Sequence, residues 1–283
     1  MSLLVTGSDG RPISQGTVDI RLDAPRPGVF FSTDFPWVEG SRLQEMHLNL
    51  RQGRANWKYL FPIRGEYRLS VDVETPDGKR TSQRFTFTIR EHSEKWLLLA
   101  AFSAGLLGVG FVAGRVFTGV PVGTAMVLAC ALVLLPAAFS AGGESSSDDG
   151  GALEIGAATV GTPAPVLWHP SGADVSDNPI QALSLKIVHL EEGKTAFELE
   201  RVPVAGDFAM KFQFTDGGEY RVDALAEEAG KPAWRSEKII SATALEPPTR
   251  AMIPAFAYFI GLLALGLGAG RWSKRRMRKS RVE

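Results

Sequence analysis

Three stretches of the chain contain no charged residue over a length that suffices to cross a lipid bilayer. Residues 96–114, 116–141 and 251–270 run for 19, 26 and 20 positions without Asp, Glu, Lys or Arg. A hydrocarbon core of about 30 Å needs about 20 helical residues. Buried helices of soluble proteins usually keep a polar face, and these segments have none. The sequence therefore predicts a membrane protein with three transmembrane α-helices.

Basic residues predict the orientation of these helices. The tail at residues 271–283 holds seven Lys and Arg, whereas no Lys or Arg occurs in residues 116–185. Basic segments next to membrane helices stay in the cytoplasm. We therefore expect a basic cytoplasmic tail in a bacterial inner (cytoplasmic) membrane, with residues 1–93 and 153–248 both in the periplasm.

Two sets of residues in the predicted helices are candidates for contacts. The membrane-interface positions at the helix ends are Trp96, Arg115, Arg271 and Trp272. The small residues that let helix backbones approach closely are Gly105, Gly108, Gly110, Gly114, Gly261, Gly266, Gly268 and Gly270. Close backbone contact drives helix association in lipid, so we expect a helix partner for these glycines, in this chain or in another.

The remaining regions show the two-residue alternation of apolar side chains that is typical of antiparallel strands. Examples are Val18, Ile20 and Leu22 in residues 1–93, and the phenylalanines around Met210 in residues 153–248. Turn sequences rich in Gly, Pro and Asp separate these runs. A two-sheet sandwich of about seven strands fits this length.

The two β regions repeat one another. The run Gly65-Glu-Tyr-Arg68 recurs 153 positions later as Gly218-Glu-Tyr-Arg221, and Ala113-Gly-Arg115 recurs 156 positions later as Ala269-Gly-Arg271. The repeated unit is a β domain followed by one helix that ends in arginine. Equivalent domains should occupy one compartment, which supports the predicted topology. The helix at 116–141 is then the retained export signal of the second unit.

No signal-peptide core precedes the first unit in residues 1–7. We therefore expect an upstream signal that is cleaved or lies before a misassigned start. The stretch at 142–152 is a flexible linker by composition. Its Asp148 and Asp149 match no calcium-loop spacing.

One tyrosine in each region predicts the sandwich type. Asp216-Gly-Gly-Glu-Tyr220 has the pattern of a tyrosine corner, in which the hydroxyl bonds back to the main chain of an immunoglobulin-like domain. Tyr67 occupies the equivalent position, but Ile63 replaces the aspartate, so we expect only a partial corner there. The predicted fold is two immunoglobulin-like all-β sandwich domains plus the three transmembrane helices.

Residues suited to chemistry are few and scattered. The four histidines show no metal-ligand spacing, and the single cysteine, Cys130, excludes a disulfide framework. No nucleophile, zinc-protease, phosphate-loop or haem-attachment motif occurs. The predicted helices contain no His, Asp, Glu or Lys, which disfavours a pump or transporter. We therefore predict no enzyme, no catalytic, cofactor-binding or metal residues, and no nucleic-acid or small-molecule partner.

The unit Gly65-Glu-Tyr-Arg68, Pro76-Asp-Gly78 and the Phe-rich run 85–89, followed by a helix, resembles the YtkA/FixH-like exported β domains. That resemblance implies copper handling and oxidase assembly. Relatives tend to carry His- and Met-rich linkers, whereas this chain has a Gly, Ser and Asp linker.

Two functions remain open at this point. The first is a structural or accessory subunit that packs its helices against other integral membrane subunits and clamps the periplasmic face of a bioenergetic complex. A photosynthetic reaction-centre or light-harvesting assembly is the first expectation for that complex, and a respiratory oxidase the second. The alternative is an assembly factor or copper chaperone. Binding of an external ligand between the domains has no feature in its favour.

Overall fold

The computed structural model describes residues 1–7, 10–13, 15–28, 33, 35–51, 53–90, 93–117, 152–170, 180–227, 233–245 and 249–279. The chain divides into two compact units, one made of strands and one made of helices. Of the predicted helix at 116–141, only the first two positions are described, and of the predicted linker at 142–152 only the last. Both predictions thus fall almost wholly outside the described residues.

The β unit contains thirteen described strands. Those of the first half are β1 (Ser2–Leu4), β2 (Gln15–Asp23), β3 (Arg42–Arg51), β4 (Arg54–Tyr59), β5 (Gly65–Glu74) and β6 (Arg80–Ile89). Those of the second half are β7 (Ala152–Ile155), β8 (Pro163–His169), β9 (Ile180–His189), β10 (Lys194–Ala205), β11 (Phe208–Gln213), β12 (Gly218–Glu227) and β13 (Trp234–Ala242).

The strands form two antiparallel sheets that enclose a common core. One sheet has the order β6-β5-β2-β3-β11-β8-β7, and the other has the order β1-β4-β10-β9-β12-β13. The sheets are linked through a single residue pair, Arg51 with Arg54, where β3 passes into β4. One cluster of buried side chains includes Val18 and Trp57 from the first half and Trp168 and Phe197 from the second. Alternating apolar residues such as Val18 and Ile20 therefore face this shared core, whereas Leu22 and Tyr67 lie in a second cluster made of first-half residues.

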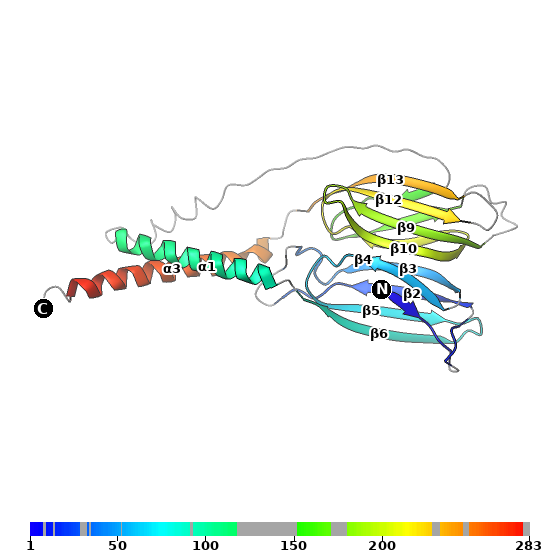
Figure 1. Ribbon diagram of the computed structural model, residues 1–283, viewed down its shortest axis with the longest axis horizontal. Coiled ribbons are helices and arrows are strands. Elements are labelled where there is room, and N and C mark those ends of the chain that lie inside the picture. Colours follow the sequence, from blue (N-terminus) through cyan, green and yellow to red (C-terminus); the bar gives the residue numbers. More distant parts are fainter. Residues whose placement is uncertain are drawn as a thin grey trace. The chain divides into compact units, whose positions relative to one another are not determined.

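The two halves are joined by strand pairing. β4 pairs with β10 and β3 pairs with β11, so strands of both halves lie side by side in each sheet (Figure 1). Residues 1–93 and 153–248, which the sequence suggests are two separate sandwiches, thus form one compact unit. The physical reason is that β3 and β4 barely pair with each other, which leaves an edge of each strand free to pair with the other half.

The junction has an approximate internal two-fold symmetry. Lys58 pairs with Glu198 across β4 and β10, and Lys211 pairs with Glu45 across β11 and β3. Both lysines and both glutamates are separated by the repeat offset of 153. The repeat has therefore folded as a pseudo-dimer within one chain, in which the same surface of each half contacts that of the other.

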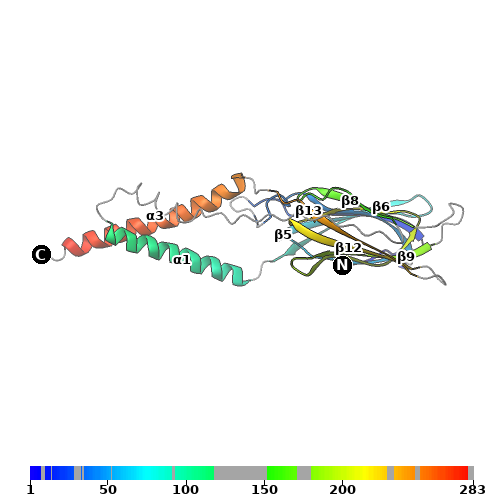
Figure 2. The ribbon, with the colours of Figure 1, turned by 90° about the horizontal axis from the view of Figure 1, so that it is seen from above.

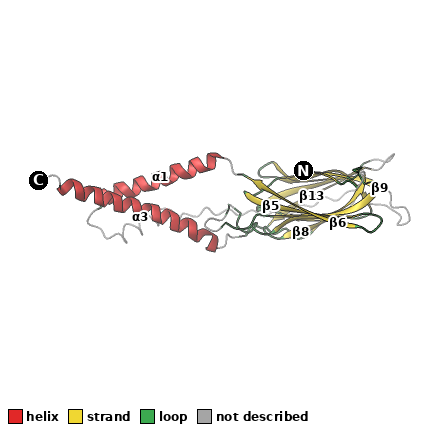
Figure 3. Ribbon diagram, turned by 90° about the horizontal axis from the view of Figure 1, so that it is seen from below, coloured by secondary structure: helices red, strands yellow, loops and turns green. Residues whose placement is uncertain are grey.

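The helical unit consists of α1 (Ser93–Val116) and α3 (Thr249–Lys279). α1 contains the predicted helix at 96–114, and α3 contains the one at 251–270. α3 also extends nine residues into the predicted tail, whose Lys and Arg residues are good helix formers. By length and composition, Glu94–Val116 and Met252–Lys274 are apolar enough to cross a membrane. The two helices approach each other toward their C-terminal ends and separate toward their N-terminal ends (Figures 2 and 3).

Candidate functional site

The contact between α1 and α3 is the most specific feature of the helical unit, and it is made of glycines. A Cβ added to Gly110 would lie 2.7 Å from the carbonyl oxygen of Leu263, and one added to Gly266 would lie 2.5 Å from that of Leu107. Gly114 and Gly270 approach the opposite main chain even more closely. Each helix thus presents a Gly-x-x-x-Gly motif to the other, which allows main-chain contact that larger side chains would block.

The helices run parallel and in matched register. Ser103 and Tyr258 share a hydrogen bond of 3.0 Å, and the rings of Phe102 and Phe259 meet edge to face with centroids 5.4 Å apart. Gly110 and Gly266 are 156 positions apart, as are Gly114 and Gly270. The helices therefore repeat the approximate two-fold relation of the β unit.

Only half of the predicted packing glycines take part in this contact. A Cβ added at any of the other four would meet no atom of the described chain within 4 Å; these are Gly105, Gly108, Gly261 and Gly268. The distinguishing signal was present in the sequence. The four contacting residues form the two Gly-x-x-x-Gly motifs, whereas the other four lie in no such motif, although Gly105 and Gly261 also recur at the offset of 156.

Basic residues of α3 close the C-terminal end of α1. Lys274 donates a hydrogen bond of 2.8 Å from Nζ to the carbonyl oxygen of Arg115, and Arg271 donates one of 3.4 Å to that of Phe117. The carbonyls at a helix C-terminus lack partners within the helix and carry partial negative charge, so cations there are stabilising. Trp96 and Trp272, the predicted interfacial tryptophans, are 56% and 60% exposed within the chain.

Two ion pairs cross the junction of the β unit at equivalent positions. Lys58 Nζ lies 3.0 Å from Glu198 Oε2, and Lys211 Nζ lies 3.3 Å from Glu45 Oε2. Lys58 also contacts Glu200, and the hydrogen bonds to Glu200 and Glu198 raise the pKa of Lys58. Because these ion pairs are largely exposed, each contributes little to stability. Their main effect is to favour this register between the neighbouring strands.

An aromatic cluster lies beneath these ion pairs. The buried ring of Phe212 meets Tyr59 of the first half at 6.2 Å, and Phe197 and Phe214 of the second half at 5.9 and 5.1 Å. Burial raises the pKa of Tyr59 well above its ordinary value. This cluster is the apolar centre of the contact between the halves.

Both predicted corner tyrosines bond back to the main chain. Tyr220 donates its hydroxyl to the carbonyl oxygen of Asp216 at 3.1 Å, and Tyr67 donates to that of Ile63, whose own N–H donates to the Tyr67 hydroxyl at 3.2 Å. The expectation of a partial corner at Tyr67 is therefore wrong. The acceptor is a main-chain carbonyl, so the isoleucine at position 63 does not weaken it.

We expect Tyr67→Phe to cost about 1–3 kcal/mol at neutral pH, because the hydroxyl makes two hydrogen bonds with Ile63 and each contributes about 0.5–1.5 kcal/mol net. Burial raises the pKa of Tyr67 to about 12. Between pH 10 and 12 the unfolded chain therefore releases the tyrosine proton while the folded chain retains it, so folding stability falls as pH rises. The variant has no tyrosine at position 67 to ionise, so its folding stability does not fall for this reason. Thermal denaturation of both proteins from pH 8 to 11.5 should show that the difference between their melting temperatures becomes smaller above pH 10. A constant difference in melting temperature would contradict this assignment.

Three of the four histidines are described, and each has a local partner. His47 Nδ1 lies 2.7 Å from Asp19, and His169 Nδ1 lies 2.9 Å from Asp207. The buried His189 accepts the N–H of Glu192 and faces the carbonyl oxygen of Gly217 at 3.2 Å. No group of three His, Cys, Asp or Glu suited to a metal occurs among the described residues. His92 and Cys130 lie outside them.

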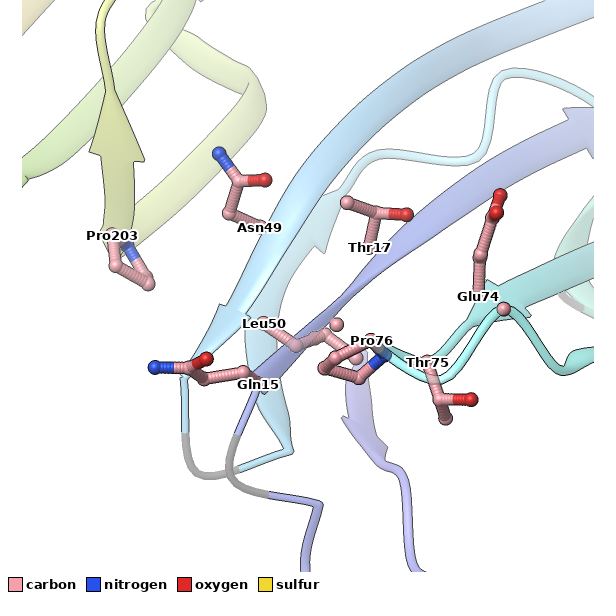
Figure 4. A pocket seen from close by; sticks show the side chains of 10 residues that line it. Gln15, Thr17, Asn49, Leu50, Glu74, Thr75, Pro76 and Pro203 are labelled. Carbon is pink, nitrogen blue, oxygen red and sulfur yellow. The ribbon is translucent and has the colours of Figure 1, made fainter.

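A cavity of about 530 Å³ opens at one end of β2, β3 and β5. The side chains of Gln15, Thr17, Asn49 and Thr75 surround it, and Pro203 of the second half lies opposite (Figure 4). Its carboxylate, Glu74, is paired with Arg80 at 3.1 Å. Its described lining combines amides and hydroxyls with no apposed nucleophile and base, so it offers binding groups without catalytic ones.

Comparison with known proteins does not assign the chain to a family. No protein family model and no curated protein matches it. Among solved structures, it is similar to the "D00-D0 domain of Intimin", with 10% sequence identity and a TM-score of 0.21 over 78% of this chain and 98% of that one.

Proposed function

We propose that this protein is a non-catalytic structural subunit of a larger integral membrane complex. In this proposal α1, α3 and the segment at 116–141 cross the bacterial inner membrane, the β unit lies in the periplasm, and the basic end of the chain is cytoplasmic. The fused pseudo-dimer of β domains would serve as a scaffold on the periplasmic face of that complex.

The observation that carries the proposal is that the two faces of each helix differ in what they contact. The glycine faces of α1 and α3 are occupied by each other, whereas their outer faces carry large apolar side chains such as Leu98 and Leu265, which are 71% and 68% exposed. Exposed apolar surface of this extent suits contact with lipid or with other membrane helices. A helix pair that is complete in itself suits a permanent subunit that docks as one body.

The chemistry of the described side chains supports a structural role over metal delivery. The histidines of the β unit are separated and each bonds to a nearby group. Glu74, the carboxylate that lines the cavity at β2, β3 and β5, is likewise paired with an arginine. The complex we expect is a bioenergetic one, with a photosynthetic assembly as the first candidate and a respiratory oxidase as the second.

Purification of the tagged full chain in mild detergent, followed by mass spectrometry and absorption spectroscopy, tests this function. Stoichiometric co-purification with a pigmented or haem-bearing core would support a permanent subunit and identify its class. Recovery of the chain alone, or of substoichiometric chain with copper, would overturn the proposal in favour of an assembly factor.

Membrane placement is tested separately. Alkaline carbonate should leave the chain in the membrane fraction, and protease added to spheroplasts should digest the β unit while a C-terminal epitope stays protected. Release by carbonate, or digestion of the epitope in intact spheroplasts, would contradict the topology.

A further inference from the structure

The cavity at β2, β3 and β5 carries polar side chains that the fold itself does not require. Thr17 of β2 pairs with Asn49 of β3 on one side and with Glu74 of β5 on the other. The equivalent row of the second half consists of Ala182, Pro203 and Glu227. Because the second half forms this row with an alanine and a proline, strand pairing needs neither the hydroxyl nor the amide of the first half.

These polar groups are available to a ligand. Among the described residues, no hydrogen bond engages the side chains of Gln15, Thr17 and Asn49. Side-chain amides and hydroxyls can each donate and accept hydrogen bonds. Glu74 is the one charged residue of the described lining, and its carboxylate accepts a hydrogen bond from Arg80 at 3.1 Å. The cavity therefore presents mainly neutral hydrogen-bonding groups.

Apolar side chains and a fixed turn complete the cavity. Leu50 and the rings of Pro76 and Pro203 supply apolar surface beside the polar groups (Figure 4). The turn that carries Pro76 is held by Thr75, whose N–H and hydroxyl donate to the carbonyl oxygen of Lys79 at 3.0 and 3.1 Å. A wall that is fixed before binding loses less conformational entropy when a ligand binds.

The described lining disfavours several classes of ligand. It contains no Lys, Arg or His to pair with an anion, and no aromatic ring on which a nucleobase would stack. Its single carboxylate is paired with an arginine and does not suit a metal ion. A peptide added as a strand needs an unpaired strand edge, whereas β2 is paired on both sides at Thr17.

We infer that this cavity binds a neutral saccharide of one or two rings. Hydroxyls of the sugar would exchange hydrogen bonds with the amides of Gln15 and Asn49 and with the hydroxyl of Thr17. The C–H faces of its rings would lie against Pro76 and Pro203. A volume of about 530 Å³ is within the range of small-molecule sites. The sequence predicts no such ligand, because these groups come together only when the strands pair.

Saturation-transfer NMR on the purified full chain tests this site. The chain is held in phospholipid nanodiscs, because maltoside detergents carry competing sugar headgroups. The probes are maltose, cellobiose and N,N′-diacetylchitobiose, and at least one should bind with a Kd of about 1 mM. Sorbitol, which has hydroxyls but no ring face, should not bind. Because this assay uses the isolated chain, its result does not depend on the proposed membrane complex.

Two variants locate the binding. Thr17→Val and Asn49→Leu each remove one polar group at nearly constant size, and each should raise the Kd about two- to tenfold, as the loss of one hydrogen bond predicts. Asn56→Leu is the matched control, because Asn56 is an exposed strand asparagine outside the cavity, and it should leave the Kd unchanged.

Three results would overturn the inference. The first is that none of the three sugars binds the parent chain. The second is equal binding by the parent chain and both cavity variants, which would place the sugar elsewhere. The third is a preference for trigalacturonic acid over the neutral sugars, since an anionic ligand contradicts a neutral site.

Discussion

Replacing Gly266 with leucine is expected to separate α1 from α3 while each helix remains formed. A Cβ at this position would lie 2.5 Å from the carbonyl oxygen of Leu107 and 3.0 Å from the Cα of Gly110. Both are main-chain atoms, so no change of rotamer relieves the overlap and the helices must move apart. Overpacking of a tight contact costs about 1–3 kcal/mol, and leucine adds three more carbons beyond the Cβ.

Cross-linking between the helices measures this effect. Ser103 and Tyr258 touch through their hydroxyls, so cysteines at both positions should be joined rapidly by a short bifunctional thiol reagent. In this background Gly266→Leu should reduce the cross-linking rate severalfold. Gly268→Leu is the matched control, because it lies in the same helix, is exposed, and has no atom within 4 Å of an added Cβ.

Substitutions in α1 should give the same two results, slower cross-linking for the contacting glycine and unchanged cross-linking for the control. Gly110→Leu should act as Gly266→Leu does, since the two residues contact each other, and Gly108→Leu should act as the control does. Equal cross-linking in a glycine variant and its control would show that the helices do not pack through these motifs.

Sequence periodicity carried most of the information about the strands. Val18, Ile20 and Leu22 alternate with polar neighbours, and all three are buried in the structure. Alternation fails to indicate burial on β6, where Phe85 also alternates but lies 47% exposed. Alternation reports which face of a strand is apolar, but it does not report whether a second sheet covers that face.

The pairing of the two halves was harder to predict, because it depends on which strand edges remain free. One signal was present in the repeat itself. Glu45 and Lys58 recur as Glu198 and Lys211, and each glutamate pairs with the lysine of the other half. Retention of complementary charges at one offset is what a self-complementary interface requires, but the same residues in separate domains would have looked like ordinary exposed charges.

Replacing Phe212 with alanine is expected to cause a large loss of stability in the β unit. The side chain is 2% exposed and contacts Tyr59, Phe197 and Phe214. Removing a buried phenylalanine leaves a cavity and costs about 3–5 kcal/mol. Phe85→Ala removes the same group from a site that is 47% exposed and should cost less than about 1 kcal/mol.

The location of Phe212 makes this variant a test of how the two halves fold. Its ring lies between Tyr59 of the first half and two phenylalanines of the second, so its loss should weaken both halves together. Amide exchange followed by mass spectrometry in increasing denaturant should show β5 and β12 becoming exposed in one transition in the parent chain, and in one transition at lower denaturant in Phe212→Ala. If β12 opened first and β5 remained protected, the halves would be independent domains held in contact. A single transition requires that the strand pairs joining β4 to β10 and β3 to β11 couple the two halves more strongly than either half is stable alone.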